Sequence, residues 1–137
     1  MSLLKVFDIA GSSMSAQSVR LNTTASNLAN ANTAAGSAKE AYHARQPLFQ
    51  TVLNEQSGEE GTAGVRIAGI VESQAEPVRV YQPGHPNADE NGYVYMSNVN
   101  TVDELVNMIS ASRSYQNSVE VLNTSKELLL RTLTLGQ

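Results

Sequence analysis

The chain has 137 residues, enough for one domain with a modest core, and its net charge of -4 and pI of about 5.1 exclude the basic surface that nucleic-acid binding needs. It has no cysteine, which excludes disulfide bonds, thiolate catalysis and zinc–thiolate sites. Hydrophobic residues make up 41% of the chain but aromatic residues only 5%, so large core side chains are scarce.

The first part of the chain, residues 1–36, is predicted to be a long helix. Large apolar residues recur there every seven residues, as one position of a heptad does: Phe7, Met14, Leu21 and Leu28. A companion position is occupied by Leu3, Ala10, Gln17, Thr24 and Ala31. The helix is expected to end near Gly36.

This helix contains residues with little intrinsic helical preference. Between Asn22 and Thr33, eight of twelve residues are Asn, Thr or Ser. Its stability must therefore come from packing, and we expect the segment to stay disordered until neighbours supply that packing. Lys5 and Asp8 interrupt the apolar start, which does not resemble a cleavable signal peptide.

The middle part, residues 37–100, is predicted to be a small β domain. Strands are expected at residues 42–53, 65–73, 77–82 and 93–96, with Pro47 marking an edge or a bulge. A polar loop at residues 55–64 and a turn-rich loop from Pro83 to Gly92 separate them. Asn91 and Gly92 favour a tight turn before the last strand.

The last part, residues 101–137, is predicted to be a second long helix, starting with a capping box of Thr101 and Glu104 and stopping at Gly136. The fold class is thus α+β, with terminal helices that pair as a coiled coil around the β domain. Each helix has about 30 residues and a length of roughly 45 Å. Because this exceeds what the β domain can cover, we expect the apolar seams to pack on each other or on other chains.

No constellation typical of an enzyme is present. His43 and His85 are the only histidines, and the chain has neither a nucleophile elbow nor a phosphate-binding glycine loop. His85 with Asp89 and Glu90 could hold a metal ion, but a proline-rich turn explains the same residues. We therefore predict no catalytic, cofactor or metal site.

The heptad residues are the stronger signal, and we predict that they form an assembly seam between helices. The seam comprises Phe7, Met14, Leu21, Leu28, Leu105, Met108, Tyr115, Val119, Leu122, Leu129 and Leu133. Arg20, Arg113 and Glu120 have no opposite charge three or four residues away, so they are either solvated or pair between helices. If the first helix ends at Gly36 and the second begins at Thr101 on the same side of the β domain, the two helices run antiparallel. Arg20 and Glu120 then lie at similar positions along the common helix axis.

Both ends of the chain resemble one family. Residues 12–33 and 98–137 are similar to the N- and C-terminal signatures of bacterial flagellar rod and hook axial proteins, and residues 80–100 resemble the middle of a proximal-rod member. The resemblance covers nearly the whole chain. Two local departures are an added residue without the usual aromatic at residues 34–37, and Ser97 where a proline is frequent.

The resemblance implies a structural subunit of the proximal rod, the periplasmic drive shaft that carries torque from the motor's membrane ring to the hook. Such proteins pair their terminal helices in a coiled-coil inner layer. They leave the cytoplasm through the flagellar type III export apparatus without a cleaved signal peptide. Implied partners are other rod proteins, the rod–ring adaptor and further copies in a helical assembly. The alternative is a soluble binding module, such as a flagellar export chaperone or adaptor, which would not need a β domain between its helices.

Overall fold

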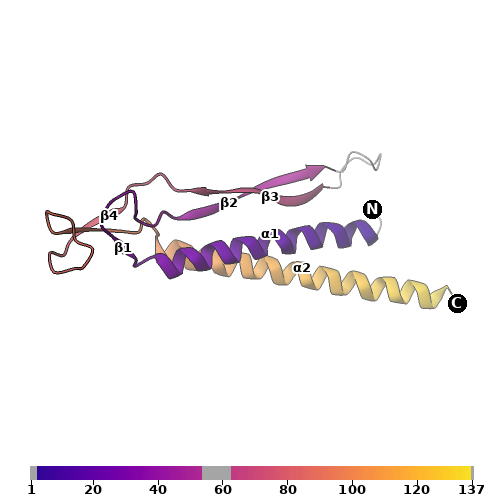
Figure 1. The fold of residues 1–137 in the computed structure, drawn as a ribbon. Coiled ribbons are helices and arrows are strands. Elements are labelled where there is room, and N and C mark those ends of the chain that lie inside the picture. Colours follow the sequence, from indigo (N-terminus) through magenta and orange to yellow (C-terminus); the bar gives the residue numbers. More distant parts are fainter. Residues whose placement is uncertain (1–2, 54–62, 137) are drawn as a thin grey trace.

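Two long helices, α1 (Leu3–Asn30) and α2 (Thr101–Leu135), lie side by side and run antiparallel, so that both chain ends lie at the same end of the molecule (Figure 1). The computed structural model describes residues 3–53 and 63–136. In the sequence between the helices, the described residues form five strands: β1 (Ala34–Ala35), β2 (Arg45–Leu53), β3 (Ala63–Glu72), β4 (Val78–Tyr81) and β5 (Tyr93–Met96). The α+β fold class with terminal helices around a β region is therefore confirmed.

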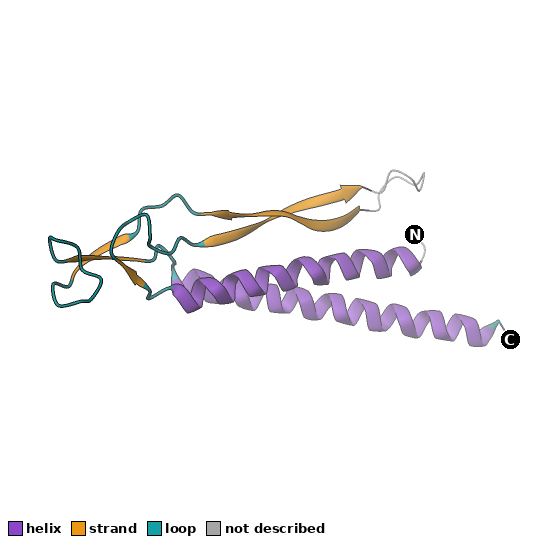
Figure 2. Cartoon of the chain, viewed as in Figure 1, coloured by secondary structure: helices purple, strands orange, loops and turns teal. Residues whose placement is uncertain are grey.

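The strands of the described residues form two separate sheets. Strands β2 and β3 form an antiparallel hairpin along α1, on the side away from α2 (Figure 2). A three-stranded sheet with the order β1-β5-β4 lies at the end of the molecule far from the termini. The four predicted strands are all present, and a bulge between Leu48 and Phe49 follows Pro47. The polar loop predicted at residues 55–64 lies almost wholly outside the described residues.

The end of α1 and the cap of α2 both differ from the prediction. Helix α1 ends at Asn30, six residues before Gly36, because the chain turns there and Ala34 and Ala35 pair with Met96 and Tyr95 of β5. Helix α2 is capped by Asn100, whose side-chain oxygen accepts hydrogen bonds from the backbone N–H groups of Val102 and Asp103. The predicted Thr101–Glu104 capping box is therefore wrong. The stop at Gly136 is confirmed.

The packed interior is made of small side chains. The buried apolar residues are five alanines and one valine: Ala10, Ala16, Ala31, Ala41, Val94 and Ala111. Thr23, Thr24 and Asn27 of α1 are buried as well. Small side chains let neighbouring backbones approach closely, and this is how α1 fits between the hairpin on one side and α2 on the other. The neighbours that this weakly helical segment needs therefore come in part from its own chain.

Asn27 fixes one end of the hairpin to α1. Its side chain is fully buried and bonds both backbone groups of Arg45: Nδ2 donates to the carbonyl oxygen at 2.8 Å, and Oδ1 accepts from the N–H at 2.9 Å. The Tyr42 hydroxyl also donates to Oδ1, at 3.0 Å. Asn27 thus satisfies the backbone at the first residue of β2, which explains a polar residue at the most buried position of α1.

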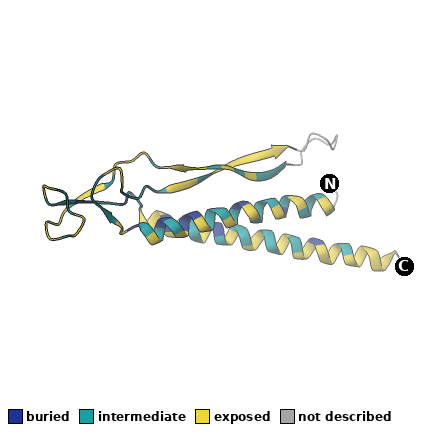
Figure 3. Cartoon of the chain, viewed as in Figure 1, coloured by how far each residue is buried: buried dark blue, intermediate teal, exposed yellow. Residues whose placement is uncertain are grey.

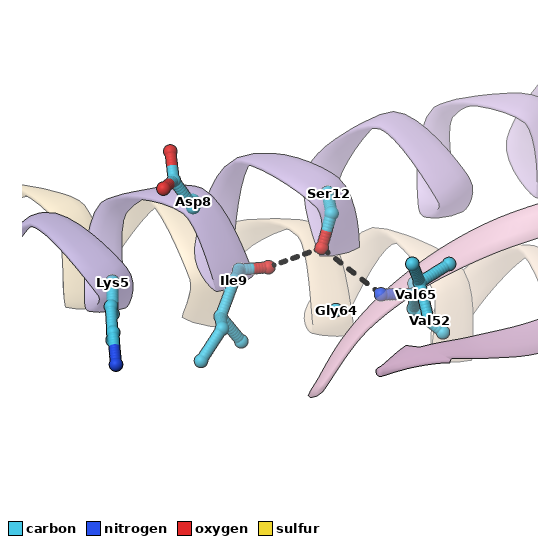
Figure 4. Close-up of a pocket in the computed structure, with 7 residues that line it drawn as sticks. All are labelled: Lys5, Asp8, Ile9, Ser12, Val52, Gly64 and Val65. Atoms are coloured by element: carbon cyan, nitrogen blue, oxygen red, sulfur yellow. Dashed lines mark hydrogen bonds between the residues drawn. The ribbon is translucent and has the colours of Figure 1, made fainter. Parts of the chain in front are cut away.

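Ser12 fixes the other end of the hairpin (Figure 4). Its hydroxyl donates to the carbonyl oxygen of Ile9 at 2.8 Å and accepts the backbone N–H of Val65 in β3 at 3.1 Å. A Cβ atom at Gly64 would lie 3.3 Å from this hydroxyl, so the absence of a side chain there permits the approach. Beside this bond, Ile9, Val52 and Val65 line a cavity of about 340 Å³ between helix and hairpin.

Asn98 joins three segments where the β region meets α2. Its Oδ1 accepts the backbone N–H of Ala44 at 2.6 Å, and its Nδ2 donates to the carbonyl oxygen of Ala75 at 2.8 Å. The ring of His43 bonds the carbonyl oxygen of Ser73 through Nδ1, at 2.9 Å. The same Nδ1 lies 3.3 Å from Asn98 Nδ2, so the His43 ring contacts both the Ser73 carbonyl and the Asn98 amide. His43 therefore has a structural position at this junction.

Replacing Asn27 with alanine is expected to release the hairpin from α1. The change leaves the N–H and carbonyl groups of Arg45 without their partner, and a buried unsatisfied group costs about 1–3 kcal/mol. We expect the free energy of unfolding in urea to fall by about 2–4 kcal/mol, and amide exchange across β2 and β3 to accelerate. The control is Asn30→Ala, because the Asn30 side chain bonds near neighbours in sequence, the Ser26 carbonyl through Nδ2 and the Thr33 hydroxyl through Oδ1. Equal losses in the two variants would contradict the role of Asn27.

Candidate assembly surface

Helix α2 is poorly covered by the rest of the chain. Only Glu104, Ala111 and Ser125 are buried among its 35 residues, and their spacing of seven and fourteen places them on the face toward α1 (Figure 3). The accessible surface of the chain is 9341 Å², whereas a compact protein of this mass exposes about 6,900 Å². The chain therefore shows about a third more surface than a compact monomer of its size, and much of the outward side of α2 is apolar.

An apolar stripe lies on α2 near its start, on the side away from α1. Val102, Leu105, Val106 and Ile109 are each between 51% and 66% exposed, and we call them the outer patch. Their spacing of three, four and seven residues aligns them on one helix face. Leu105 was predicted as part of the seam, and the other three were missed. The same spacing is visible in the sequence, but the apolar face of this helix was assigned through Leu105 and Met108 instead.

A second apolar surface lies at the end of α2. The hydroxyls of Ser13 and Ser118 are 3.1 Å apart, and continuing this antiparallel register places Leu3 near residue 128. Residues 128–135, which we call the C-terminal extension, therefore run on past α1, as the ribbon shows (Figure 1). Leu128, Leu130, Leu133 and Leu135 are 50–88% exposed there. A helix that is apolar on several sides is typical of a buried position.

The predicted seam residues lie around the contact between the helices rather than at its centre. Two of them, Leu105 and Leu133, are exposed. The others are half-buried: Phe7, Met14, Leu21, Leu28, Met108, Tyr115, Val119, Leu122 and Leu129. The companion position is the buried one, with Ala10, Thr24 and Ala31. The large side chains thus border the α1–α2 contact, and their role in assembly stays a prediction.

The three candidate charges have different surroundings. Arg20 is half-buried, and its Nη2 donates to Asn107 Oδ1 of α2 at 3.1 Å, so it does join the two helices. Arg113 and Glu120 are exposed. Arg20 lies beside Asn107, and Glu120 is thirteen residues further along α2, a distance of roughly 20 Å. The prediction that Arg20 and Glu120 lie at similar positions along the helix axis is therefore wrong. The error arises because α1 ends at Asn30 and not at Gly36.

Arg20 borders a polar cavity where α1, α2 and β2 meet. The cavity has a volume of about 340 Å³ and is lined on its polar side by Arg20, Arg45, Glu104 and Asn107. Glu104 is only 5% exposed. A buried carboxylate needs opposite charges or hydrogen bonds around it, and here two guanidinium groups share its cavity. Arg45 also pairs with Glu72 at 3.2 Å on the hairpin surface. Of these side chains, Arg20 joins α1 to α2 through Asn107, and both guanidinium groups line the same cavity as Glu104.

The residues of the alternative metal interpretation form a turn. Asp89 Oδ1 accepts the backbone N–H groups of Asn91 and Tyr93, at 2.9 and 2.8 Å, and His85 Nδ1 accepts that of Asn87. Gly92 has a φ of 80°, the left-handed conformation that the predicted Asn91-Gly92 turn favours. Among the described residues, no three acidic or histidine side chains gather as a metal site would require. Within the same residues, neither helix is apolar enough over its length to cross a membrane.

The turn at Asp89 is expected to open in acid. The Tyr93 N–H lowers the pKa of Asp89, and the Asn91 N–H, the Arg79 charge and the Tyr95 hydroxyl add to the effect. A lowered pKa means that the carboxylate stabilises the turn above its ordinary pKa of about 3.9, and that this support is lost as the pH falls through the folded-state value.

This prediction is checked by following the amide signals of Asn91 and Tyr93 by NMR between neutral and acid pH. The control is Asp89→Asn, whose side-chain oxygen accepts the same bonds without titrating. We expect the acid transition of these signals to disappear in the variant. An unchanged transition would show that another group controls the turn.

Comparisons with known proteins identify the family. Residues 7–34 match the family described as flagella basal body rod protein, and residues 90–135 match the C-terminal region of flagellar basal body rod FlgEFG proteins. Flagellar basal-body rod protein FlgC of Salmonella typhimurium is 54% identical, and that of Yersinia enterocolitica is 57% identical, with full coverage of both chains in each case. FlgC of Buchnera aphidicola from Acyrthosiphon pisum is 42% identical, also over the full length. The chain therefore belongs to the FlgC family of flagellar basal-body rod proteins.

Proposed function

We propose that this chain is a structural subunit of the flagellar basal-body rod, in its proximal part, and that it acts by packing its terminal helices against neighbouring subunits. One observation carries the proposal: α2 presents exposed apolar side chains at both ends while burying only three residues against its own chain. A stable soluble monomer rarely exposes contiguous apolar surfaces of this kind, and such surfaces are typical of protein contacts.

The geometry suits a shaft. Helices α1 and α2 are parallel to the long axis of the molecule, with the hairpin beside them (Figure 2). Repeated lateral contacts between such helices resist twisting, because many half-buried side chains must move together when one subunit rotates against the next. Torque from the motor's membrane ring would thus pass through the packed helices toward the hook.

The proposed partners follow from this role. Neighbours in the rod are other rod proteins and further copies of this chain, and at the base the rod–ring adaptor. We propose that the chain reaches the periplasm through the flagellar type III export apparatus without a cleaved signal. A core in which alanine predominates supports this route, since small side chains contribute little hydrophobic free energy and the chain unfolds readily for a narrow channel. A chaperone or adaptor role is not favoured, because it leaves the two sheets without a purpose.

A charge in the outer patch is expected to block assembly without unfolding the chain. Ile109 is 55% exposed, so Ile109→Glu leaves the isolated fold intact. In a packed interface the unpaired carboxylate costs several kcal/mol, which corresponds to at least a tenfold loss of incorporation. The measurement is the amount of subunit in purified basal bodies, together with swimming, in cells lacking the native copy.

The control for this experiment is Gln116→Glu. Gln116 is also exposed on α2 and lies seven residues from Ile109, one heptad along the same face. This variant introduces the same charge outside the outer patch, and we expect near-normal incorporation. Normal swimming with Ile109→Glu would contradict the assignment of the outer patch as an assembly contact.

A further inference from the structure

The two apolar surfaces of α2 cannot cover each other within one chain. The outer patch begins at Val102 and the C-terminal extension begins at Leu128, which are 26 residues apart on one continuous helix. At 1.5 Å per residue the two surfaces are separated by roughly 39 Å. Each therefore needs a cover from outside the chain.

The two surfaces match in length. Each spans seven residue steps, Val102 to Ile109 and Leu128 to Leu135, or roughly 10 Å of helix. The outer patch is a stripe with the i, i+3, i+4, i+7 spacing that receives a second helix. The extension carries leucines on several sides, so it can lie on such a stripe and still touch a further neighbour.

The charges within the two surfaces are opposite. Asp103 lies among the residues of the outer patch, and Arg131 lies within the extension; both are exposed. In the part of the chain that the structure describes, neither side chain has a hydrogen bond or an ion pair. An unpaired carboxylate on one surface and an unpaired guanidinium on the other provide charge complementarity.

We propose that the C-terminal extension of one copy of this chain packs on the outer patch of a second copy, with Arg131 facing Asp103. The proposal rests on the proposed function as an assembly subunit and names one contact of that assembly. The contact joins two different surfaces, so it is heterologous. Each copy then still offers one free patch and one free extension, and the contact repeats without closing.

Cysteine cross-linking tests this contact directly, because the natural chain has no cysteine. Val106→Cys marks the outer patch and Leu133→Cys marks the extension; both positions are 61% exposed, so the fold tolerates the changes. The full-length variants are oxidised separately, mixed together, and combined in one chain, over a series of protein concentrations. Products are counted by size on non-reducing gels.

We expect the mixture of single variants to form disulfide-linked dimers at least fivefold faster than either variant alone. The double variant is expected to form a ladder of dimers, trimers and larger products. Equal rates for the mixture and for the single variants would overturn the proposal, and so would a mixture that forms no dimers. A double variant that stops at dimers would also overturn it, since this indicates two antiparallel copies that cover each other reciprocally.

A charge exchange tests the pairing. Asp103→Arg in the patch-bearing chain is expected to slow the mixed cross-link about fivefold, and Arg131→Asp in the other chain is expected to restore it. Failure of the second change to restore the rate would remove Arg131 as the partner of Asp103. The test is separate from the proposed function: if Ile109→Glu prevents incorporation into basal bodies but the mixed cross-link is absent, the rod function stands and the head-to-tail contact falls.

Discussion

The close approach of α1 to its two neighbours is the constraint on which the rest of the structure depends. Ala10 and Thr24 are buried beside α2, and Ala16, Thr23 and Asn27 continue the stripe of α1 that begins at Ser12 toward the hairpin. Only small side chains at these positions let the backbones come close enough for one asparagine to bond both backbone groups of Arg45. Larger apolar residues would add hydrophobic surface but would push the elements apart and break these bonds. The polar composition of α1 is thus a requirement of packing, and it outweighs weak helix propensity.

The same constraint determines what the surface looks like. With alanines, threonines and one asparagine filling the interior, most of the leucines, valines and isoleucines of α2 remain exposed. A monomer built in this way gains little from hydrophobic burial. Contacts with other subunits bury what the chain itself leaves exposed, so folding and assembly draw on separate sets of residues in one short sequence. Substitutions in the interior and substitutions on the outward side of α2 should therefore have distinguishable effects.

Local patterns in the sequence were sufficient for both helices and for every described strand except β1, and non-local contacts decided most of what the patterns missed. Heptad spacing located both helices, and alternation located four strands, because these signals come from residues close together in the chain. The pairing of Ala34 with Met96 ended α1 early, and no pattern within the helix announces it. The bonds from Ser12 and Asn27 to the hairpin connect residues 53 and 18 positions apart, beyond what spacing can show. The position of Arg20 along the helix axis relative to Glu120 was predicted wrongly because α1 ends at Asn30 and not at Gly36. The division of the chain into three parts at residues 36 and 100 stays a prediction.

Attachment of the hairpin at two places has a mechanical consequence. A strand pair joined to a helix at one point can swivel about it, whereas two joints fix direction as well as position. Asn27 and Ser12 lie fifteen residues apart on α1, roughly 22 Å along its axis. Helix α1 and the hairpin therefore behave as one stiff unit, and a force that bends or twists α1 must also deform the strands. This stiffness depends on the distance between the Asn27 and Ser12 attachments rather than on the strength of either hydrogen bond. A protein whose interior holds few large side chains can therefore still be rigid along its length.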